Sequence, residues 1–136
     1  MTSGTLVAVV DRDELPALIH RLADRLGTLS LTRLAARVEG YESRAKAAHA
    51  AAGRLAELAQ GVEERSGSAP PDWRPLPWIG DAFVTDQLAV VGTDLSRALQ
   101  HVADDTLVWT RAGRRTAADV LDAAVAEVRR AKDLVG

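Results

Sequence analysis

The sequence predicts an all-α protein, an up-down four-helix bundle with one dominant long helix over residues 30–63 and a Pro/Trp-rich connector. Apolar or small residues recur with alternating spacings of three and four from Leu31 to Val62, which is typical of one continuous helix. Further amphipathic stretches follow residues that favour helix starts, and four of the five prolines fall in one segment between them. These observations predict a single helical domain, residues 1–136, with helices over 13–26, 30–63, 81–103 and 116–134 and a connector over 64–80.

The composition restricts the class of protein. With 136 residues, 47% of them hydrophobic, the chain is long and apolar enough to bury a core. It contains no Cys, which excludes disulfides and thiolate chemistry. The net charge of −2 argues against a dedicated nucleic-acid binder, because such proteins usually carry a basic surplus. No apolar run approaches the roughly 20 residues that a membrane helix needs, so we expect a cytoplasmic protein without a membrane segment.

The first predicted helix covers residues 13–26. Asp11 and Glu14 have the spacing of a capping box, and Pro16 is tolerated only in the first helical turn, so the helix should begin near residue 13. Gly27 is expected to end it as the C′ residue. A connection this short to the next helix predicts an antiparallel helical hairpin.

The long second helix carries the predicted interaction seam. Its middle is alanine, and small side chains let helix axes approach near the lower end of the usual ~8–10 Å range, so another helix should cross close to Ala48. Gly40 costs about 1 kcal/mol of helix propensity relative to Ala, and a break at Gly40 is the alternative to one continuous helix. At about 45–50 Å the helix would overhang its neighbours. Its uncovered seam would be met by the connector, by the N-terminal run or by a second copy, and we favour a homodimer. The seam consists of Leu31, Leu34, Val38, Tyr41, Ala45, Ala48, Ala52 and Leu55.

The connector over 64–80 combines prolines, which favour extended backbone, with large apolar side chains. A loose linker seldom carries such side chains, so we expect this segment to be pinned against the helices. The predicted anchors are Trp73, Leu76, Trp78 and Ile79. Asp81 is then expected to cap the third helix.

Two short runs resemble strands. Leu6–Val10 and Thr106–Thr110 are rich in β-branched residues and could pair as a small ribbon, although two strands alone would be marginal. A basic turn follows the second run. Its Arg111, Arg114 and Arg115 form a candidate anion-binding site, and the alternative is that these are solvated charges near a helix end.

The chain offers no convergent catalytic or metal-binding set. His20, His49 and His101 fall one on each of the first three predicted helices, at positions that do not converge in an up-down bundle. His20 with Asp24, and His101 with Asp105, have the spacing of ordinary surface ion pairs. There is no G-x-S-x-G motif and no phosphate-binding glycine loop. We therefore expect no cofactor and no metal, and the residues favour a non-enzymatic protein.

The stretch Leu26–Gly40 resembles the opening of a helix-turn-helix of the repressor type, with Ala35 or Ala36 as the small residue of its first helix and Gly40 at the turn. This resemblance implies a DNA-binding regulator built on residues 26–50. The uninterrupted heptad pattern instead predicts helix where the turn should be, and it favours the long helix.

Trp78-Ile79-Gly80 is a W-x-G sequence in the connection between two long helices. It is similar to the small helical-hairpin proteins exported by type VII secretion systems, and this resemblance implies a protein of that kind. The chain departs from them in its proline-rich connector and in its extra first and fourth helices. In the alternative interpretation Trp78 anchors the loop and Gly80 lets the third helix begin.

Taken together, the residues favour a non-enzymatic protein–protein interaction or assembly module, a helical monomer or homodimer whose partner they do not identify. A helix-turn-helix regulator is the alternative, and an enzyme comes third.

Overall fold

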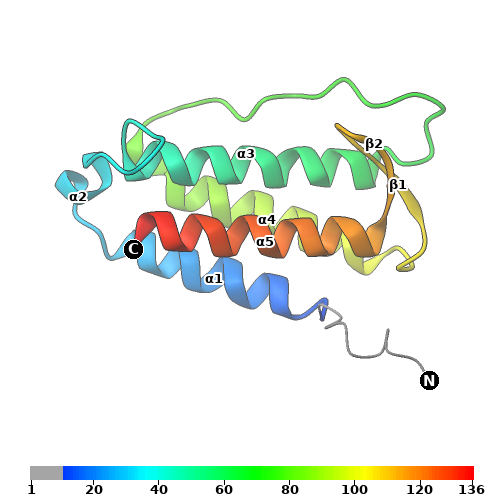
Figure 1. Cartoon of the computed structure of the whole chain (residues 1–136), viewed down its shortest axis with the longest axis horizontal. Helices are drawn as coiled ribbons and strands as arrows, with labels where there is room; N and C mark the ends of the chain where they lie inside the picture. The colour runs from blue at the N-terminus through cyan, green and yellow to red at the C-terminus, as the bar shows by residue number, and fades with distance from the viewer. Residues whose placement is uncertain (1–10) are drawn as a thin grey trace.

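The computed structural model describes residues 11–136 (Figure 1). These residues are mostly helical, which confirms the helical class predicted from the sequence. The strand predicted over Leu6–Val10, and with it the pairing to Thr106–Thr110, lies outside the described residues. In chain order the elements are α1 (Glu14–Gly27), α2 (Leu31–Ala35), α3 (Arg44–Glu63), the 3-10 helix η2 (Asp81–Phe83), α4 (Val84–Gln100), β1 (Leu107–Thr110), β2 (Gly113–Thr116) and α5 (Ala117–Val135).

The four long helices lie side by side (Figure 1). α1 packs on α4 and α5, and α3 packs on the same two helices. Their inward faces are built from Leu, Val and Ala and form one continuous core. The largest side chains in it, among them Leu15, Leu22, Leu55, Leu88 and Leu95, are fully buried. This core fixes the helices as one rigid body, because a close-packed interior resists shifts of its parts.

The prediction of one helix over 30–63 is wrong. The five-residue α2 ends at Ala35, because the following Ala36 has an extended ψ of 139°, and α3 begins only after an intervening loop. In that loop Val38 pairs with Tyr41 across a tight turn in which Gly40 has φ +83°. An L side chain rarely adopts this φ, whereas Gly does so at no steric cost. Val38 and Tyr41 match the heptad spacing, but they lie in a loop and pair with each other instead of continuing a helical seam.

Local caps set the start of α3. The Ser43 hydroxyl oxygen accepts a hydrogen bond from the backbone N–H of Lys46 at 3.0 Å, as an N-cap does. Next to it, the Arg44 side chain donates to the carbonyl oxygen of Val135 at 3.0 Å and to that of Arg33 at 3.2 Å. Arg44 therefore ties the end of α2 and the end of α5 to the start of α3.

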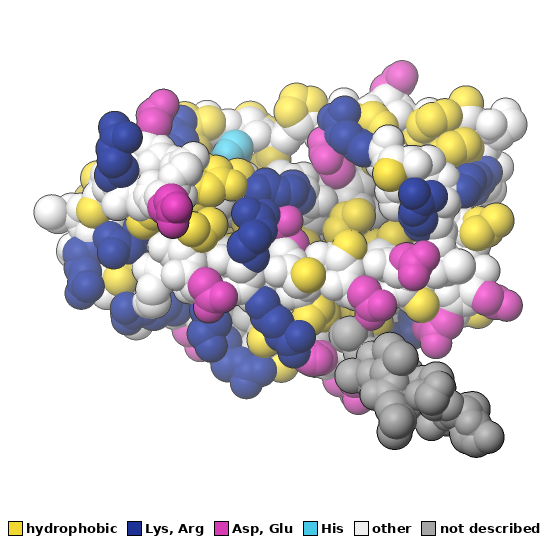
Figure 2. Space-filling model, viewed as in Figure 1, with side chains coloured by type: hydrophobic (Ala, Val, Ile, Leu, Met, Phe, Trp, Pro, Cys, Tyr) yellow, Lys and Arg dark blue, Asp and Glu magenta, His cyan; other side chains and the backbone are white. Residues whose placement is uncertain are grey.

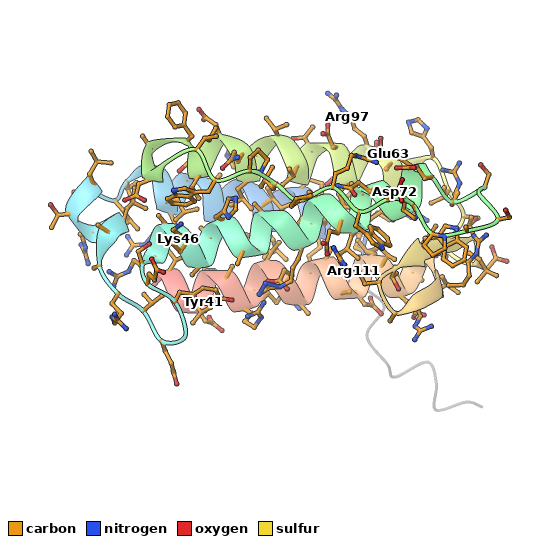
Figure 3. The ribbon with its side chains drawn as sticks, turned by 90° about the horizontal axis from the view of Figure 1, so that it is seen from above. Tyr41, Lys46, Glu63, Asp72, Arg97 and Arg111 are labelled. Atoms are coloured by element: carbon orange, nitrogen blue, oxygen red, sulfur yellow. The ribbon has the colours of Figure 1, made fainter. Side chains whose placement is uncertain are left out.

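α3 and α4 run in the same direction, so the up-down prediction is also wrong (Figure 1). The reason is the connector over 64–80, which has no helix or strand and returns along α3 (Figure 3). The Gln60 side chain, near the end of α3, donates to the carbonyl oxygen of Arg74 and accepts from its N–H, both at 2.9 Å. Further back along α3, His49 Nε2 lies 3.2 Å from the carbonyl oxygen of Pro77. The chain is thus back beside the start of α3 when α4 begins.

A β-hairpin over 107–116 occupies the place where the sequence predicted one strand and a basic turn. Its strands β1 and β2 pair antiparallel. Gly113 has φ +104°, a conformation that closes the turn without strain only for Gly. The hairpin lies against the end of α3 so closely that a Cβ added at Gly61 would be 1.8 Å from the carbonyl oxygen of Trp109.

Three predicted helix ends differ from the structure. The capping box of Asp11 and Glu14 is not formed, because the Asp11 carboxylate accepts from the N–H of Asp13 at 2.9 Å instead. Gly27 is the last residue of α1, and its φ is not positive, so it is not a left-handed C′ residue. Asp81 makes no side-chain cap, and the 3-10 turn η2 precedes α4.

Candidate interaction surface

Exposed large hydrophobic side chains gather where the connector leads into α4. Ile79 is 55% exposed, Phe83 51% and Val90 59%. Together with Leu76 they line an apolar groove of about 230 Å³. Leu31, 63% exposed, lies on α2, which packs on η2 beside this groove. We call this surface the apolar edge, and it is formed by Leu31, Leu76, Trp78, Ile79, Phe83 and Val90.

Polar contacts of the connector hold the apolar edge in place. The carbonyl oxygen of Pro77 accepts a hydrogen bond from the Gln87 side-chain amide at 2.9 Å and lies beside His49. The Trp78 ring packs edge-on against the His49 ring, with centroids 5.3 Å apart. Lys46 Nζ lies 3.8 Å from the Trp78 ring centroid, a cation–π contact. The edge is therefore presented by a pinned segment, which was the expectation for the connector.

Local backbone geometry explains why these side chains face outward. Gly80 has φ +117° and turns the chain into η2, which leads directly into α4. Phe83 and Val90, seven residues apart, then share the outer face of this helix. Val84 and Leu88 face the core and are buried.

The predicted connector anchors have different surroundings. Leu76 packs against the core, and Trp78 lies between Lys46 and His49. Trp73 is half-buried, and the Arg111 guanidinium lies 5.6 Å from its ring centroid. Ile79 points away from the helices and is the most exposed of the four.

The predicted seam is divided between the core and the surface. Its alanines and Leu55 are fully buried by other helices of the same chain, and Leu34 is buried as well. Val38 and Tyr41 are half-buried in the loop before α3, and only Leu31 is largely exposed. The buried members are Leu34, Ala45, Ala48, Ala52 and Leu55.

The three arginines of the predicted anion site do not converge. Arg111 donates two hydrogen bonds to the Glu57 carboxylate, at 2.7 and 2.9 Å, and this contact raises the pKa of Arg111. Arg114 lies over the Trp109 ring, 4.0 Å from its centroid, and donates to two carbonyl oxygens at the start of the connector at 2.6 and 2.8 Å. Arg115 donates to the carbonyl oxygen of Arg114. Each guanidinium is engaged within the chain.

A polar ring that sequence reasoning missed joins the 36–43 loop to α3 and α5. Arg54 donates to the Tyr41 hydroxyl at 3.0 Å, and its Nε lies 3.1 Å from the Glu127 carboxylate. Arg130 contacts the same two groups. The hydrogen bond from Arg130, with the charge of Arg54, lowers the pKa of Tyr41 against the opposing effect of partial burial. No spacing in the sequence links these residues, since they meet only through tertiary packing.

Two further hollows lie outside the apolar edge. A groove of about 470 Å³ between α1 and α4 is lined by Ile19, His20, Gly92 and Ser96 among others. A pocket of about 270 Å³ between α3, α5 and the hairpin is lined by small and apolar side chains together with salt-bridged Arg and Glu.

The described residues 11–136 hold neither a cluster of metal-ligating side chains nor a membrane-spanning helix. In that part of the chain, no three His, Cys, Asp or Glu side chains stand close enough to share a metal ion. The His20 ring instead lies 3.2 Å from the Asp24 carboxylate. None of the helices in the same range combines the length and the apolar character that crossing a bilayer requires.

The structure shows the geometry of the two stretches on which the resemblances rest. Residues 26–50 hold the end of α1, the short α2, an eight-residue loop over 36–43 and the start of α3. A helix-turn-helix joins its two helices by about three or four residues, so this segment has a different geometry. The face seen in Figure 2 mixes Lys and Arg with Asp and Glu and carries no field of one sign. In the W-x-G sequence, Trp78 anchors the connector and Gly80 turns it into η2.

No known protein family matches this chain, and neither does any curated protein or solved structure. Function is therefore inferred from the residues and their geometry.

Proposed function

We propose that this protein is a non-enzymatic protein–protein interaction module that binds its partner through the apolar edge. The proposal rests on where the exposed hydrophobic side chains lie. Of the six large hydrophobic side chains that the described residues expose, five belong to the edge. Single exposed apolar side chains are common on any protein, whereas a contiguous cluster marks an interaction site.

The scaffold behind the edge supports this function. Four packed helices and a connector pinned at Gln60, His49 and Gln87 hold the apolar side chains in position before any partner arrives. Binding then orders little additional chain, and less conformational entropy is lost on association. Aromatic residues such as Trp78 and Phe83 are the side chains that most often supply binding energy at interfaces.

The proposal is tested by site-specific photo-crosslinking in cells that make the protein naturally. A benzophenone-bearing phenylalanine analogue replaces Phe83, and we expect a covalent adduct with another polypeptide. The adduct should disappear when Ile79→Glu and Val90→Glu are added, because these substitutions place charge on the apolar edge. The circular dichroism spectrum of each variant checks that the helices are retained.

Leu107 provides the matched control. It is 55% exposed, as Ile79 is, but lies on the hairpin outside the edge. The analogue at Leu107 should give no adduct. Equal adducts from both positions, or none from Phe83, would contradict the proposal.

A further inference from the structure

The apolar edge offers non-polar area to a protein–protein interface. Trp78 and Phe83, 37% and 51% exposed, offer roughly 130–220 Å² of apolar surface if a fully exposed aromatic side chain has about 150–250 Å², and Leu31, Ile79 and Val90 add to it. A standard interface buries about 800 Å² per partner, of which about 56–65% is non-polar. The edge therefore supplies part of the non-polar share of such an interface, and a polar rim would form around it.

Opposite charges flank the edge on two different helices. Lys46, on α3, lies over Trp78 at one side of the edge. Asp86, on α4, lines the apolar groove. Within residues 11–136 neither side chain takes part in an ion pair. Lys46 is seen near one end of the molecule in Figure 3, beside the connector.

A second acceptor without a donor lies next to Asp86. The Gln87 amide nitrogen is used by the carbonyl oxygen of Pro77, but the Gln87 amide oxygen is buried and accepts no hydrogen bond. The buried Gln87 oxygen is out of reach of a partner, so Asp86 is the acceptor that α4 presents at the groove. Lys46, which lies over Trp78 outside the groove lining, carries an ammonium group without an acidic partner.

A surface with a donor at one place and an acceptor at another is complementary to itself. A two-fold rotation brings the basic side of one copy against the acidic side of the other, so that one contact is made twice. A partner of uniformly basic or acidic character would satisfy one side and meet like charge on the other, which is unfavourable. The charge pattern therefore favours a second copy over an unrelated partner.

We propose that the apolar edge binds a second copy of this chain in a two-fold homodimer, with Lys46 of each copy facing Asp86 of the other. The inference rests on the proposed function, because it names the partner of the same surface. It differs from the homodimer predicted through the alanine seam, since those alanines are buried inside a single chain.

Charge reversal tests the pairing. The molar mass of the purified chain is measured by light scattering and analytical ultracentrifugation from low to high micromolar concentration. Wild type should approach twice the 14.5 kDa of one chain. Lys46→Glu and Asp86→Lys should each weaken dimerisation by about tenfold or more, because each places like charges opposite one another. The double variant should recover the wild-type dissociation constant to within a few-fold.

Two control variants separate this effect from general charge changes. Asp94→Lys changes the same charge on the exposed surface of α4, away from the apolar groove, and should leave dimerisation unchanged. Phe83→Glu should abolish dimerisation, whereas Leu107→Glu should not.

Each outcome decides a different point. A strictly monomeric particle at every concentration overturns the second copy, and an adduct between Phe83 and a different protein would then still support the interaction module. Dimerisation that both single variants weaken but the double variant does not restore overturns the Lys46–Asp86 pairing. A dimer insensitive to Phe83→Glu overturns the placement on the apolar edge.

Discussion

At the scale of single residues, Tyr41 shows how packing changes the chemistry of a side chain. Its hydroxyl lies between Arg130 from α5 and Arg54 from α3, and both stabilise the phenolate. The hydrogen bond from Arg130 has the largest effect and lowers the pKa of Tyr41 from its ordinary value of 10.0. Neighbouring residues in the sequence do not contribute, so the shift exists only in the folded protein.

The pKa of Tyr41 can be measured without labels. It is the one Tyr in the chain, so tyrosinate absorbance near the red edge of the aromatic band reports this group alone. We expect the midpoint in the native protein below 10.0 and, in Arg130→Gln, closer to 10.0. Arg129→Gln is the matched control, because Arg129 pairs with Glu14 instead. An unchanged midpoint in Arg130→Gln would show that this contact is not formed in solution.

The same shift makes stability depend on pH in a defined direction. The folded pKa of Tyr41 is lower than the unfolded one, so the unfolded state binds more protons between the two values. The free energy of unfolding therefore gains a contribution from Tyr41 as pH rises from the folded pKa toward about 10. This contribution is lost as pH falls again through the folded pKa. The difference in free energy of unfolding between wild type and Tyr41→Phe should grow in favour of wild type over that window.

At the scale of elements, the break between α2 and α3 decides how the chain turns. Gly40 supplies the positive φ, and Ser43 restarts the helix. Gly53, in contrast, lies inside α3, and an added Cβ would meet no atom within 4 Å there. The two glycines are therefore in opposite situations, although in the heptad pattern both lie off the seam of one continuous predicted helix.

Substitution by Ala should separate the two glycines. Gly40→Ala should lower the free energy of unfolding by about 1–2 kcal/mol, because an L residue is strained at this φ. Gly53→Ala should raise it by up to about 1 kcal/mol through helix propensity. Urea unfolding followed by circular dichroism measures both. Stabilisation by both substitutions would instead support a continuous helix over 30–63.

The connector gives a second prediction at this scale. The Gln60 amide makes two hydrogen bonds to the backbone of Arg74, each worth about 1 kcal/mol. Gln60→Ala should therefore ease local opening and speed chymotryptic cleavage after Trp73 and Trp78 by about five- to thirty-fold. Gln100→Ala, on the exposed last residue of α4, is the control and should leave the cleavage rate unchanged.

At the scale of the whole molecule, the direction of α4 is what assembles the apolar edge. Because the connector runs back along α3, α4 begins at the end of the molecule where α2 lies, and η2 packs on α2. In an up-down bundle the third long helix would begin at the opposite end, and Phe83 would lie far from Leu31. The interaction module and its proposed homodimer therefore depend on this crossover.

Several parts of the fold could be predicted from particular residues. The last helix is predicted to begin at residue 116, and the Thr116 hydroxyl accepts from the N–H of Asp119 at 3.1 Å, as an N-cap does. The prolines and tryptophans of the connector indicated an extended, pinned segment, which is what residues 64–80 form. Gly40 was recognised as the one place at which the long helix could break. Its φ could not be derived, because propensity costs at Gly are too small to choose between helix and turn.

Some residues of the apolar edge could be predicted from the sequence, but their assembly into one surface could not. The sequence predicts Leu76, Trp78 and Ile79 as anchors. A large apolar side chain in a loop can pack against the helices or remain exposed, and the sequence does not distinguish the two. Phe83 and Val90 fall within the predicted third helix over 81–103, and nothing in the pattern joins them to Leu31. The polar ring around Tyr41 gave no signal, since its members are distributed over three elements.

The sequence by itself determined the helical class, the positions of most helices and the extended connector, because these follow from periodicity, caps and proline over a few residues at a time. Only the tertiary structure decided the break at Gly40, the shared direction of α3 and α4, and which apolar side chains remain uncovered. Those depend on which segments pack together, and packing is settled by contacts between residues far apart in the chain.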